Sequence, residues 1–405
     1  MTRTLLQNVR PWGGETTDVV LADGVVAGTR PAGGAPEPGA ERVDGRGRIL
    51  LPSFSDVHVH LDSTRIGLPF RPHTGSPGVW DMMLNDRRNW RSAEASMAER
   101  TTTTLGRMIA HGTTSVRTYA QVDVDSGLER LDAVVAAKET HAGRADVTIM
   151  AFPQAGLLRE DGAPELLARA MESGADVVGG IDPCALDRDP VRHLDIVFGL
   201  AERFAAPIDI HLHEPDQLAR FSAELVVERV KALDMRGRVT ISHGYGLGRL
   251  PERELRALLE DFREYDIAMA TVAPPTPLPT LLLAEHGIRL GLGEDGQRDY
   301  WTPYGNADML DRTWQMAFTN GFRRDTDIEH CVAVATVGGR SVIGTAPRLR
   351  SADDRPGLAV GDPADLVLVE GDTVTAAVMD RSPDRTVLRR GVVVADGLAL
   401  TGVEA

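Results

Sequence analysis

The stretch SDVHVHLDST, from Ser55 to Thr64, places two histidines one residue apart at the end of an apolar run. Alternate residues of a β-strand point to the same face, so His58 and His60 would project side by side into one space. Two ligands of one metal ion would be presented in this way. A hydrogen-bonded pair at a strand end is the simpler reading of an isolated pair, so the rest of the chain must decide.

From about residue 51 onward, short β-branched runs alternate with longer helical stretches. The predicted units pair residues 53–60 with 94–110, 113–120 with 128–140, 145–153 with 164–173, 175–182 with 190–204, 206–213 with 216–235, 238–244 with 252–264, 266–274 with 278–286, and 287–295 with 306–320. Eight such units are the number that forms a closed parallel barrel. We therefore predict an α/β fold, the (β/α)8 TIM barrel with its helices outside. An open doubly wound sheet is the alternative, but the sequence has no Gly-rich dinucleotide-binding loop to support it.

The two ends of the chain do not share this alternation. The segments LADGVVAG and GRGRILLP near the N-terminus, and GDPADLVLVE and TVLRRGVVVADG near the C-terminus, have strand-turn-strand character. We therefore predict a small β-sandwich domain made of residues 1–51 and 346–405, beside a barrel domain of residues 52–345. This arrangement requires the two ends of the chain to meet in space.

Composition excludes several classes of partner. The 405 residues carry a net charge of -15 and no long block of Lys and Arg, so a nucleic-acid polymer would be repelled. The two cysteines, Cys184 and Cys331, lie far apart in sequence, which favours a reducing compartment without disulfides. Neither a signal-like segment nor a membrane-spanning apolar run appears, so we expect a cytoplasmic protein that does not bind membranes.

In a (β/α)8 barrel the chemistry lies at the C-terminal ends of the strands, and this rule sorts the histidines. Five fall in predicted helices or at their ends, where solvated or capping roles are expected: His111, His141, His193, His286 and His330. Five others end predicted strands: His58, His60, His211, His213 and His243. The remaining one, His73, lies in a long loop after the first strand, from where a contribution to a pocket is left open.

Two acidic residues pass the same test. Asp295 ends the eighth strand, and Glu214 follows the fifth. Three imidazoles and one carboxylate suit Zn²⁺ or Fe²⁺ with room for a water, and the predicted set is His58, His60, His211 and Asp295. Such an ion lowers the pKa of its water toward neutrality and makes a hydroxide nucleophile, with His243 within reach as base or electrostatic partner.

Several motifs carry a family resemblance. HVHLDST, AFPQAG, IDIHLHE, ISHG and EDGQRDYWTPYGNADML resemble, in order and approximate spacing, motifs of the amidohydrolase superfamily and of its cytosine deaminase branch. ADVVGGIDP and RDYWTPYGNADM are similar to the N-isopropylammelide amidohydrolases of triazine breakdown. The resemblance implies one divalent ion per chain, because VVGGID offers no lysine to bridge two metals. We expect Zn²⁺, with Fe²⁺ as the second choice.

The resemblance also implies roles for single residues. The metal ligands are those named above, and Asp295 would accept a proton as well. Glu214 matches the glutamate that carries a proton from water to the ring nitrogen, and His243 matches the histidine that orients the water. Three residues are assigned to substrate binding. Gln154 would hydrogen-bond to the amide edge of the ring, Trp301 would form a wall of the pocket, and Asp62 is the third. Regular strand geometry disagrees at one point, since it would place His213 rather than Glu214 on the face of His211. Because strand ends bend into loops, we follow the motif, which requires the strand to end near His211, and we keep a direct part for His213 as the alternative.

The chain departs from the cytosine deaminases at the substrate. They carry an aspartate directly after the strand-eight ligand, where this chain has Gly296, and their RTHVDV motif reads RTYAQVDVD here. Loss of that carboxylate would open space for a bulkier or differently substituted ring.

The predicted reaction is hydrolytic displacement of ammonia or an alkylamine from an aminated N-heterocycle, such as a cytosine-, ammelide- or pterin-like ring. Opening of a cyclic amide is the alternative within the enzyme class. A noncatalytic binding protein on the same fold is the alternative outside it, because a fold does not secure a function. Association into a homo-oligomer is left open.

Overall fold

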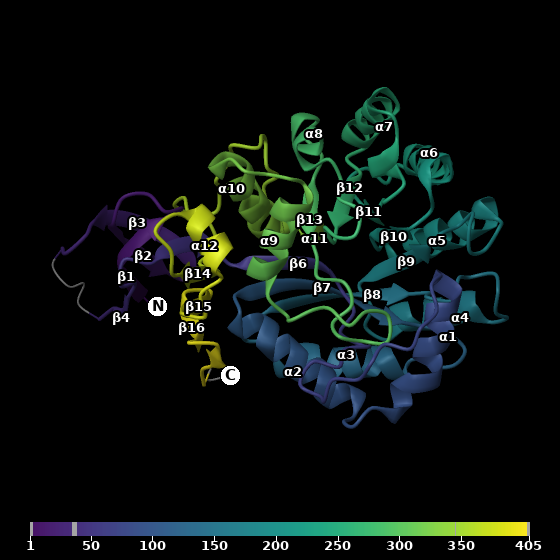
Figure 1. Ribbon diagram of the computed structural model, residues 1–405, viewed down its shortest axis with the longest axis horizontal. Helices are drawn as coiled ribbons and strands as arrows, with labels where there is room; N and C mark the ends of the chain where they lie inside the picture. The colour runs from purple at the N-terminus through teal and green to yellow at the C-terminus, as the bar shows by residue number, and fades with distance from the viewer. Residues whose placement is uncertain (1–2, 35–38, 345, 403–405) are drawn as a thin grey trace.

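The computed structural model describes residues 3–34, 39–344 and 346–402 and contains both predicted parts of the fold. Figure 1 shows the barrel in blue, teal and green with helices around it, and the purple and yellow ends of the chain lying together at one side. The expected meeting of the two ends is therefore confirmed.

The barrel is a single sheet of parallel strands. Within the described ranges it has eight: β6 (Phe54–Val59), β7 (Thr113–Gln121), β8 (Asp146–Phe152), β9 (Val177–Ile181), β10 (Ile208–Leu212), β11 (Val239–His243), β12 (Ala268–Thr271) and β13 (Leu290–Leu292). Each strand pairs with the next in chain order. The first and last meet through a parallel bridge between Val59 and Asp295, where the Asp295 N–H donates to the His58 carbonyl at 2.7 Å. The seam that closes the barrel thus joins two segments that carry predicted metal ligands.

The helices outside the barrel confirm the alternation. They are α2 (Met97–Ala110), α3 (Glu129–Thr140), α4 (Ala163–Glu172), α5 (Pro190–Phe204), α6 (Asp216–Ala232), α7 (Glu252–Glu264), α8 (Thr280–Glu285) and α9 (Met309–Thr319). Local sequence explains their limits and faces: α2 begins with a capping box between Ser96 and Glu99, and α7 buries Leu255, Leu258 and Phe262 on one side. Across the part of the chain that the structure describes, no helix is both long enough and apolar enough to cross a membrane.

Further helical segments lie outside the eight strand-helix units that the sequence predicted. They are α1 (Val79–Asn89), η1 (Trp90–Ser92), η2 (Leu247–Arg249), α10 (Asp325–Ala333), the π-helical turn η3 (Val334–Gly338), α11 (Gly339–Ile343) and α12 (Val374–Asp380). Helix α1 escaped notice because it has no apolar stripe: the side chains that it buries include Asn85 and Asp86. Segments α11 and η3 pack against β6 and β13.

Both ends of the chain build the second sheet. Over the residues described, its nine strands are β1 (Arg3–Pro11), β2 (Thr17–Ala22), β3 (Val25–Pro31), β4 (Glu41–Asp44), β5 (Ile49–Pro52), β14 (Leu366–Val369), β15 (Arg385–Arg389), β16 (Val392–Asp396) and β17 (Ala399–Leu400). Strand β5 unites the ends, since it pairs with β1 on one side and β14 on the other. Leu6, Leu50, Leu366 and Leu388 belong to a separate apolar core there. The fold is the predicted TIM barrel with a small sandwich; the domain boundaries stay a prediction, and residue 345 lies outside the described residues.

A buried polar layer closes the barrel beneath the strand ends. Arg117 on β7 donates to Asp209 on β10 at 3.0 Å, and the Tyr119 hydroxyl donates to the same carboxylate at 3.0 Å. All three side chains are buried. The Tyr119 ring lies 4.2 Å from that of His58, centroid to centroid, so this layer supports the histidines above it.

Candidate active site

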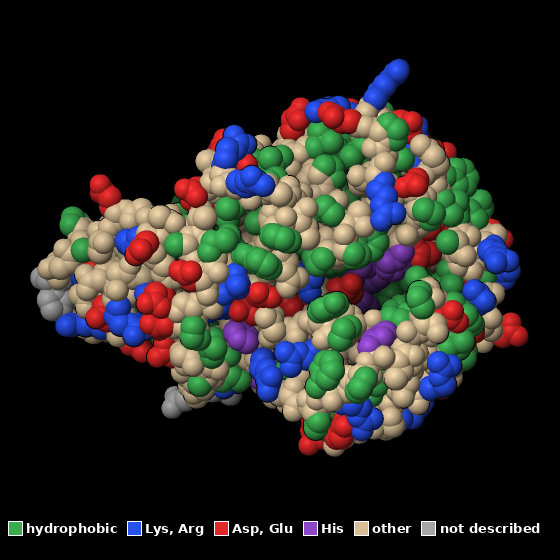
Figure 2. Space-filling model, viewed as in Figure 1, with side chains coloured by type: hydrophobic (Ala, Val, Ile, Leu, Met, Phe, Trp, Pro, Cys, Tyr) green, Lys and Arg blue, Asp and Glu red, His purple; other side chains and the backbone are tan. Residues whose placement is uncertain are grey.

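The five strand-end histidines converge on one space. Ring centroids lie 5.4 Å apart for His58 and His60, 4.5 Å for His58 and His211, 4.5 Å for His58 and His243, and 4.4 Å for His213 and His243. His58, His211 and His243 lie in strands β6, β10 and β11, and His60 and His213 directly follow β6 and β10. Figure 2 shows histidine side chains in the hollow of the barrel face. The structure therefore brings together the five histidines that the strand-end rule selected.

The potential ligand atoms form two overlapping groups. One contains His58, His60 and His211, and the other contains His58, His243 and Asp295; within each group the atoms all lie within 4.8 Å of one another. A carboxylate oxygen of Asp295 lies 3.4 Å from Nε2 of His60 and 3.6 Å from Nε2 of His58. The four predicted ligands are close neighbours, and His243 is near enough to contact the same centre.

The chemistry of these residues fits a divalent cation. Among the described residues, the buried ring nitrogens of His58 and His211 have no hydrogen-bond partner. Burial, followed by the neighbouring imidazoles, holds the pKa of each of these histidines well below its ordinary value. A neutral imidazole is the form that binds a metal, and an unpaired buried nitrogen is costly unless it has a ligand. These imidazoles are therefore suited to hold an ion.

Backbone strain marks two of the same positions. His243 and Asp295 have left-handed φ angles of 65° and 62°. Such angles are uncommon for residues other than glycine, and they concentrate at functional sites, where the surrounding structure holds them. Here the barrel seam holds Asp295 through its backbone hydrogen bonds.

The histidines open into a pocket of about 350 Å³. Nine predicted residues line it: His60, Asp62, Gln154, His211, His213, His243, Asp295, Gly296 and Trp301. His58 lies fully buried beside them. His73 lines a neighbouring cavity of about 300 Å³ with Arg65 and Tyr300 instead.

Glu214 is not among the residues that line the pocket. One carboxylate oxygen accepts hydrogen bonds from the backbone N–H groups of Cys184 and Ala185, both at 2.8 Å. The other oxygen accepts from the Ser222 hydroxyl at 2.5 Å. Burial raises the pKa of this carboxyl. Its contacts connect the segment after β9 to α6, and the predicted proton shuttle thus lacks a place in the pocket wall.

His213 occupies the position that regular strand geometry predicts. Strand β10 keeps its ladder to Leu212, so His211 and His213 share a face, and both line the pocket. Nδ1 of His213 is 2.8 Å from Asp182, and the His213 backbone N–H donates to the same carboxylate at 2.6 Å. Burial alone would lower the pKa of His213, but Asp182 raises it. The histidine that regular strand geometry favoured over Glu214 is therefore the one that lines the pocket.

Other pocket residues were missed from the sequence. They include Ser63, Val79, Met82, Gln121, Tyr245, Asp299 and Thr302. The Tyr245 hydroxyl lies 3.0 Å from Nδ1 of His243 and so helps to orient that ring. Gln121 falls in RTYAQVDVD, the motif already noted as a departure at the substrate. Val79 and Met82 belong to α1, and the lack of an apolar pattern hid both the helix and its place in the wall.

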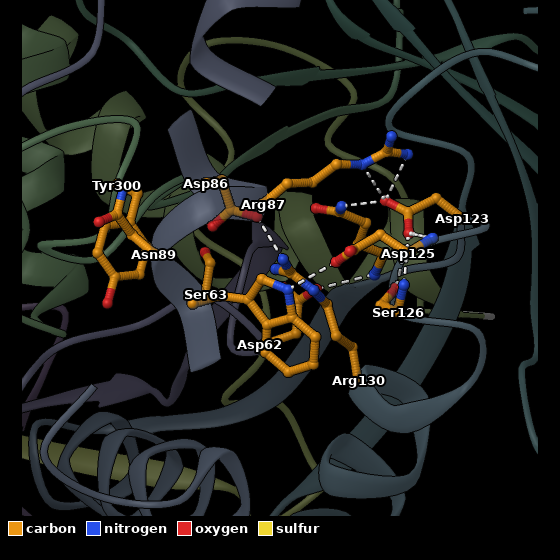
Figure 3. A network of polar contacts seen from close by, with 12 residues as sticks. Asp62, Ser63, Asp86, Arg87, Asn89, Asp123, Asp125, Ser126, Arg130 and Tyr300 are labelled. Carbon is orange, nitrogen blue, oxygen red and sulfur yellow. Dashed lines mark hydrogen bonds and ion pairs between the residues drawn. The ribbon is translucent and has the colours of Figure 1, made fainter. Parts of the chain in front are cut away.

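A buried ion network fixes α1 over the pocket. Arg130 of α3 is fully buried, pairs with Asp86 of α1, and has a nitrogen 3.7 Å from Asp62. Arg87 of α1 pairs with Asp123 at 3.1 Å. Figure 3 shows these side chains meeting between the helices. One oxygen of Asp62 accepts from the backbone of β7, and its other, buried oxygen has no partner among the described residues.

Comparisons with known proteins agree with this architecture. A family model described as "Amidohydrolase family" matches residues 79–395. The crystal structure of N-isopropylammelide isopropylaminohydrolase from Burkholderia multivorans is 38% identical, covers 99% of this chain and 100% of its own, and superimposes with a TM-score of 0.91. The 5-methylcytosine deaminase of Klebsiella pneumoniae is 25% identical with a TM-score of 0.78, and 99% of each chain is covered. The pterin deaminase of Rhizobium rhizogenes is 27% identical over 93% of this chain and 87% of its own.

Proposed function

The chain belongs to the amidohydrolase family, and from that premise we propose that it hydrolyses a carbon–nitrogen bond of an aminated N-heterocycle. The products would be an oxo ring and ammonia or an alkylamine. The observation that carries this proposal is the convergence of His58, His60, His211 and Asp295 at the edge of a pocket with ring-sized volume. Similar proteins that act on ammelide, 5-methylcytosine and pterin rings support this substrate class.

We assign one divalent ion to His58, His60, His211 and Asp295, with Zn²⁺ the first candidate and Fe²⁺ the second. Imidazole nitrogens with one carboxylate suit both ions. When bound, the ion would lower the pKa of a water molecule toward neutrality. His243, held by Tyr245, is placed to orient that water.

His213 is the proton carrier that the geometry favours. Asp182 engages Nδ1, which leaves Nε2 as the ring nitrogen for exchange in the pocket. Attack on a C=N bond needs a proton at the ring nitrogen, and the departing amine needs another, so the reaction requires two proton transfers, and His213 is our candidate for both. Glu214 then has a positioning role, because its contacts tie the segment after β9 to α6.

The rest of the wall selects the ring. Gln154 can donate to and accept from an amide edge, and Asp62 lines the same pocket. Trp301 offers an apolar face beside them. The mixture suits an oxo-amino heterocycle better than a purely apolar ligand.

The proposal is tested with protein loaded separately with Zn²⁺ or Fe²⁺. N-isopropylammelide, 5-methylcytosine, cytosine and pterin are supplied, and released ammonia or amine is measured, while elemental analysis gives the ion content. We expect turnover of at least one ring with one ion per chain, and loss of both ion and turnover in His211→Ala. Full ion content in that variant would refute the ligand assignment.

The two alternatives give different results. Ring opening would consume a cyclic amide without releasing ammonia, and a noncatalytic protein would bind rings without turning them over. Either result with fully loaded protein would overturn the proposed reaction. A cytoplasmic location stays a prediction.

A further inference from the structure

Asp299 lies in the wall of the substrate pocket, in the segment between β13 and α9. The residue is 7% exposed and borders both the pocket and the neighbouring cavity. A Cβ atom added to Gly296 would lie 2.6 Å from Oδ2 and 3.0 Å from Oδ1 of Asp299. The carboxylate is therefore packed directly against the bare backbone of Gly296, which itself lines the pocket.

The hydrogen bonds of this carboxylate leave one side unused. Oδ1 accepts from the backbone N–H groups of Trp301 at 2.8 Å and Thr302 at 2.9 Å. Oδ2 accepts from the Ser63 hydroxyl at 2.9 Å. Each carboxylate oxygen can accept two hydrogen bonds, so Oδ2 retains one free position. That oxygen is also the nearer of the two to Gly296.

We propose that Asp299 binds the substrate by accepting a hydrogen bond from a ring N–H through Oδ2, and that glycine at position 296 leaves the room that this carboxylate needs in the pocket. This inference rests on the proposed function, because that function specifies the kind of ring that enters the pocket. It restricts the substrates to oxo heterocycles that present an N–H group at this wall. A ring methylated on that nitrogen would lose the hydrogen bond and would clash.

The structure indicates a different role for Gly296 from the one that the sequence suggested. The sequence alone suggested that a missing side chain there opens space for a bulkier ring. Instead Asp299 fills the place of a side chain, since even one methyl group at position 296 would overlap its Oδ2. The pocket therefore keeps a carboxylate beside the strand-eight ligand, supplied from three residues further along the chain.

A merely structural role for Asp299 predicts a different outcome from the same substitution. Asn in place of Asp keeps an oxygen for the N–H groups of Trp301 and Thr302, so the turn that carries Trp301 is preserved. Its NH2 group would replace Oδ2, where it can donate to the Ser63 hydroxyl but cannot accept from a ligand. Asp299→Asn therefore inverts the polarity of the proposed contact and leaves the turn in place.

The test measures ligand binding, so it does not depend on turnover. Calorimetry with the metal-loaded protein compares uracil, 1-methyluracil and 3-methyluracil, which differ in their ring N–H groups. Burial raises the pKa of Asp299 to about 7, so titrations at pH 8 keep it mainly ionised. We expect the unmodified protein to bind one methyl derivative about 10- to 100-fold more weakly than uracil, as for loss of a hydrogen bond to a charged group.

In Asp299→Asn, uracil affinity should fall by the same factor, and the discrimination between uracil and that derivative should disappear. The matched control is Asp189→Asn, another aspartate that accepts a backbone N–H in a turn, at the start of α5 and outside the pocket lining. It should change neither affinity nor discrimination. If the unmodified protein binds uracil no better than Asp299→Asn does, or if discrimination survives in that variant, the proposal is wrong.

Gly296→Ala provides a second, independent test. Its methyl group would displace the Asp299 carboxylate, so uracil affinity should fall as in Asp299→Asn, with the ion content retained. The double variant should lose little beyond either single one, because both changes remove the same contact. Additive losses would overturn the coupling between the two positions. Failure of the substrate screen together with the expected binding results would refute the proposed reaction and leave this contact supported.

Discussion

At the scale of single residues, His213 and Glu214 are neighbours in the chain with opposite surroundings. His213 faces the pocket and pairs with Asp182, whereas both oxygens of Glu214 are engaged by backbone N–H groups and Ser222. A group that moves protons during turnover has to reach the substrate, either directly or through one water. This requirement favours the histidine over the glutamate.

Paired substitutions distinguish the two residues. His213→Asn should lower kcat by about 10²- to 10⁴-fold, the usual contribution of a general acid-base group, with the ion retained. Glu214→Gln should lower kcat by much less, because the amide oxygen can still accept from Cys184 and Ala185 while the NH2 group donates to Ser222. Single-turnover rates and elemental analysis of both variants check this. A large loss in Glu214→Gln with near-normal His213→Asn would restore the glutamate as the shuttle.

The sequence could place these residues only in part. The two-residue repeat of a strand correctly predicted that His211 and His213 share a face, because β10 remains regular to Leu212. The direction of Glu214 depends on backbone N–H groups of Cys184 and Ala185, which approach from the segment after β9. No local pattern in IDIHLHE carries that information. The motif resemblance supplied a residue identity, and the fold supplied the direction of its side chain.

At the scale of elements, α1 is a polar helix whose place depends on buried charge. Arg130 of α3 pairs with Asp86 of α1, and its guanidinium also lies 4.7 Å from the Trp90 ring. Val79 and Met82 on the same helix line the substrate pocket. Periodicity arguments detect apolar stripes, so a helix held by ion pairs was read as loop, although its neighbours α2 and α3 were found.

Removing the anchor should loosen this helix. Arg130→Met leaves Asp86 and Asp62 buried without their cation, a change that typically costs about 3–5 kcal/mol. We expect that loss in the free energy of unfolding measured with urea, together with a raised KM because α1 forms pocket wall. The control is Arg91→Met, whose partner Asp125 and own side chain are both partly exposed, and such pairs contribute about 1 kcal/mol or less. Equal losses in the two variants would contradict the anchoring role.

At the scale of the whole molecule, two sheets share one continuous stretch of chain. Only Ser53 separates β5, in the sheet built by both ends, from β6, the first strand of the barrel. The regular alternation of strands and helices made the barrel predictable, and strand-turn-strand segments at both ends made the sandwich predictable. Segments η3 and α11 were missed, and α10 was not assigned to a unit, because these segments follow the last barrel unit as successive helices, outside the repeat that identified the others.

Helix α10 also buries a histidine, His330, that does not line the active-site pocket. His330 is 1% exposed, and within the described residues neither ring nitrogen has a hydrogen-bond partner. Burial, and after it the charge of Arg355, lowers the pKa of His330 to about 4. An unfolded histidine titrates near pH 6.5, so between these values the unfolded chain binds a proton that the folded chain excludes.

The consequence for stability has a definite sign. The contribution of neutral His330 is complete above about pH 6.5 and is lost as the pH falls toward 4, at up to about 1.4 kcal/mol per pH unit. His330→Leu removes this titration, so its free energy of unfolding should fall less steeply between pH 6.5 and 4.5, by about that amount per unit. Urea unfolding of metal-free protein checks this, because protonation of the predicted metal ligands then affects both proteins alike and cancels in the difference. Parallel pH profiles for the two proteins would show that His330 takes up its proton in the folded state as readily as in the unfolded chain.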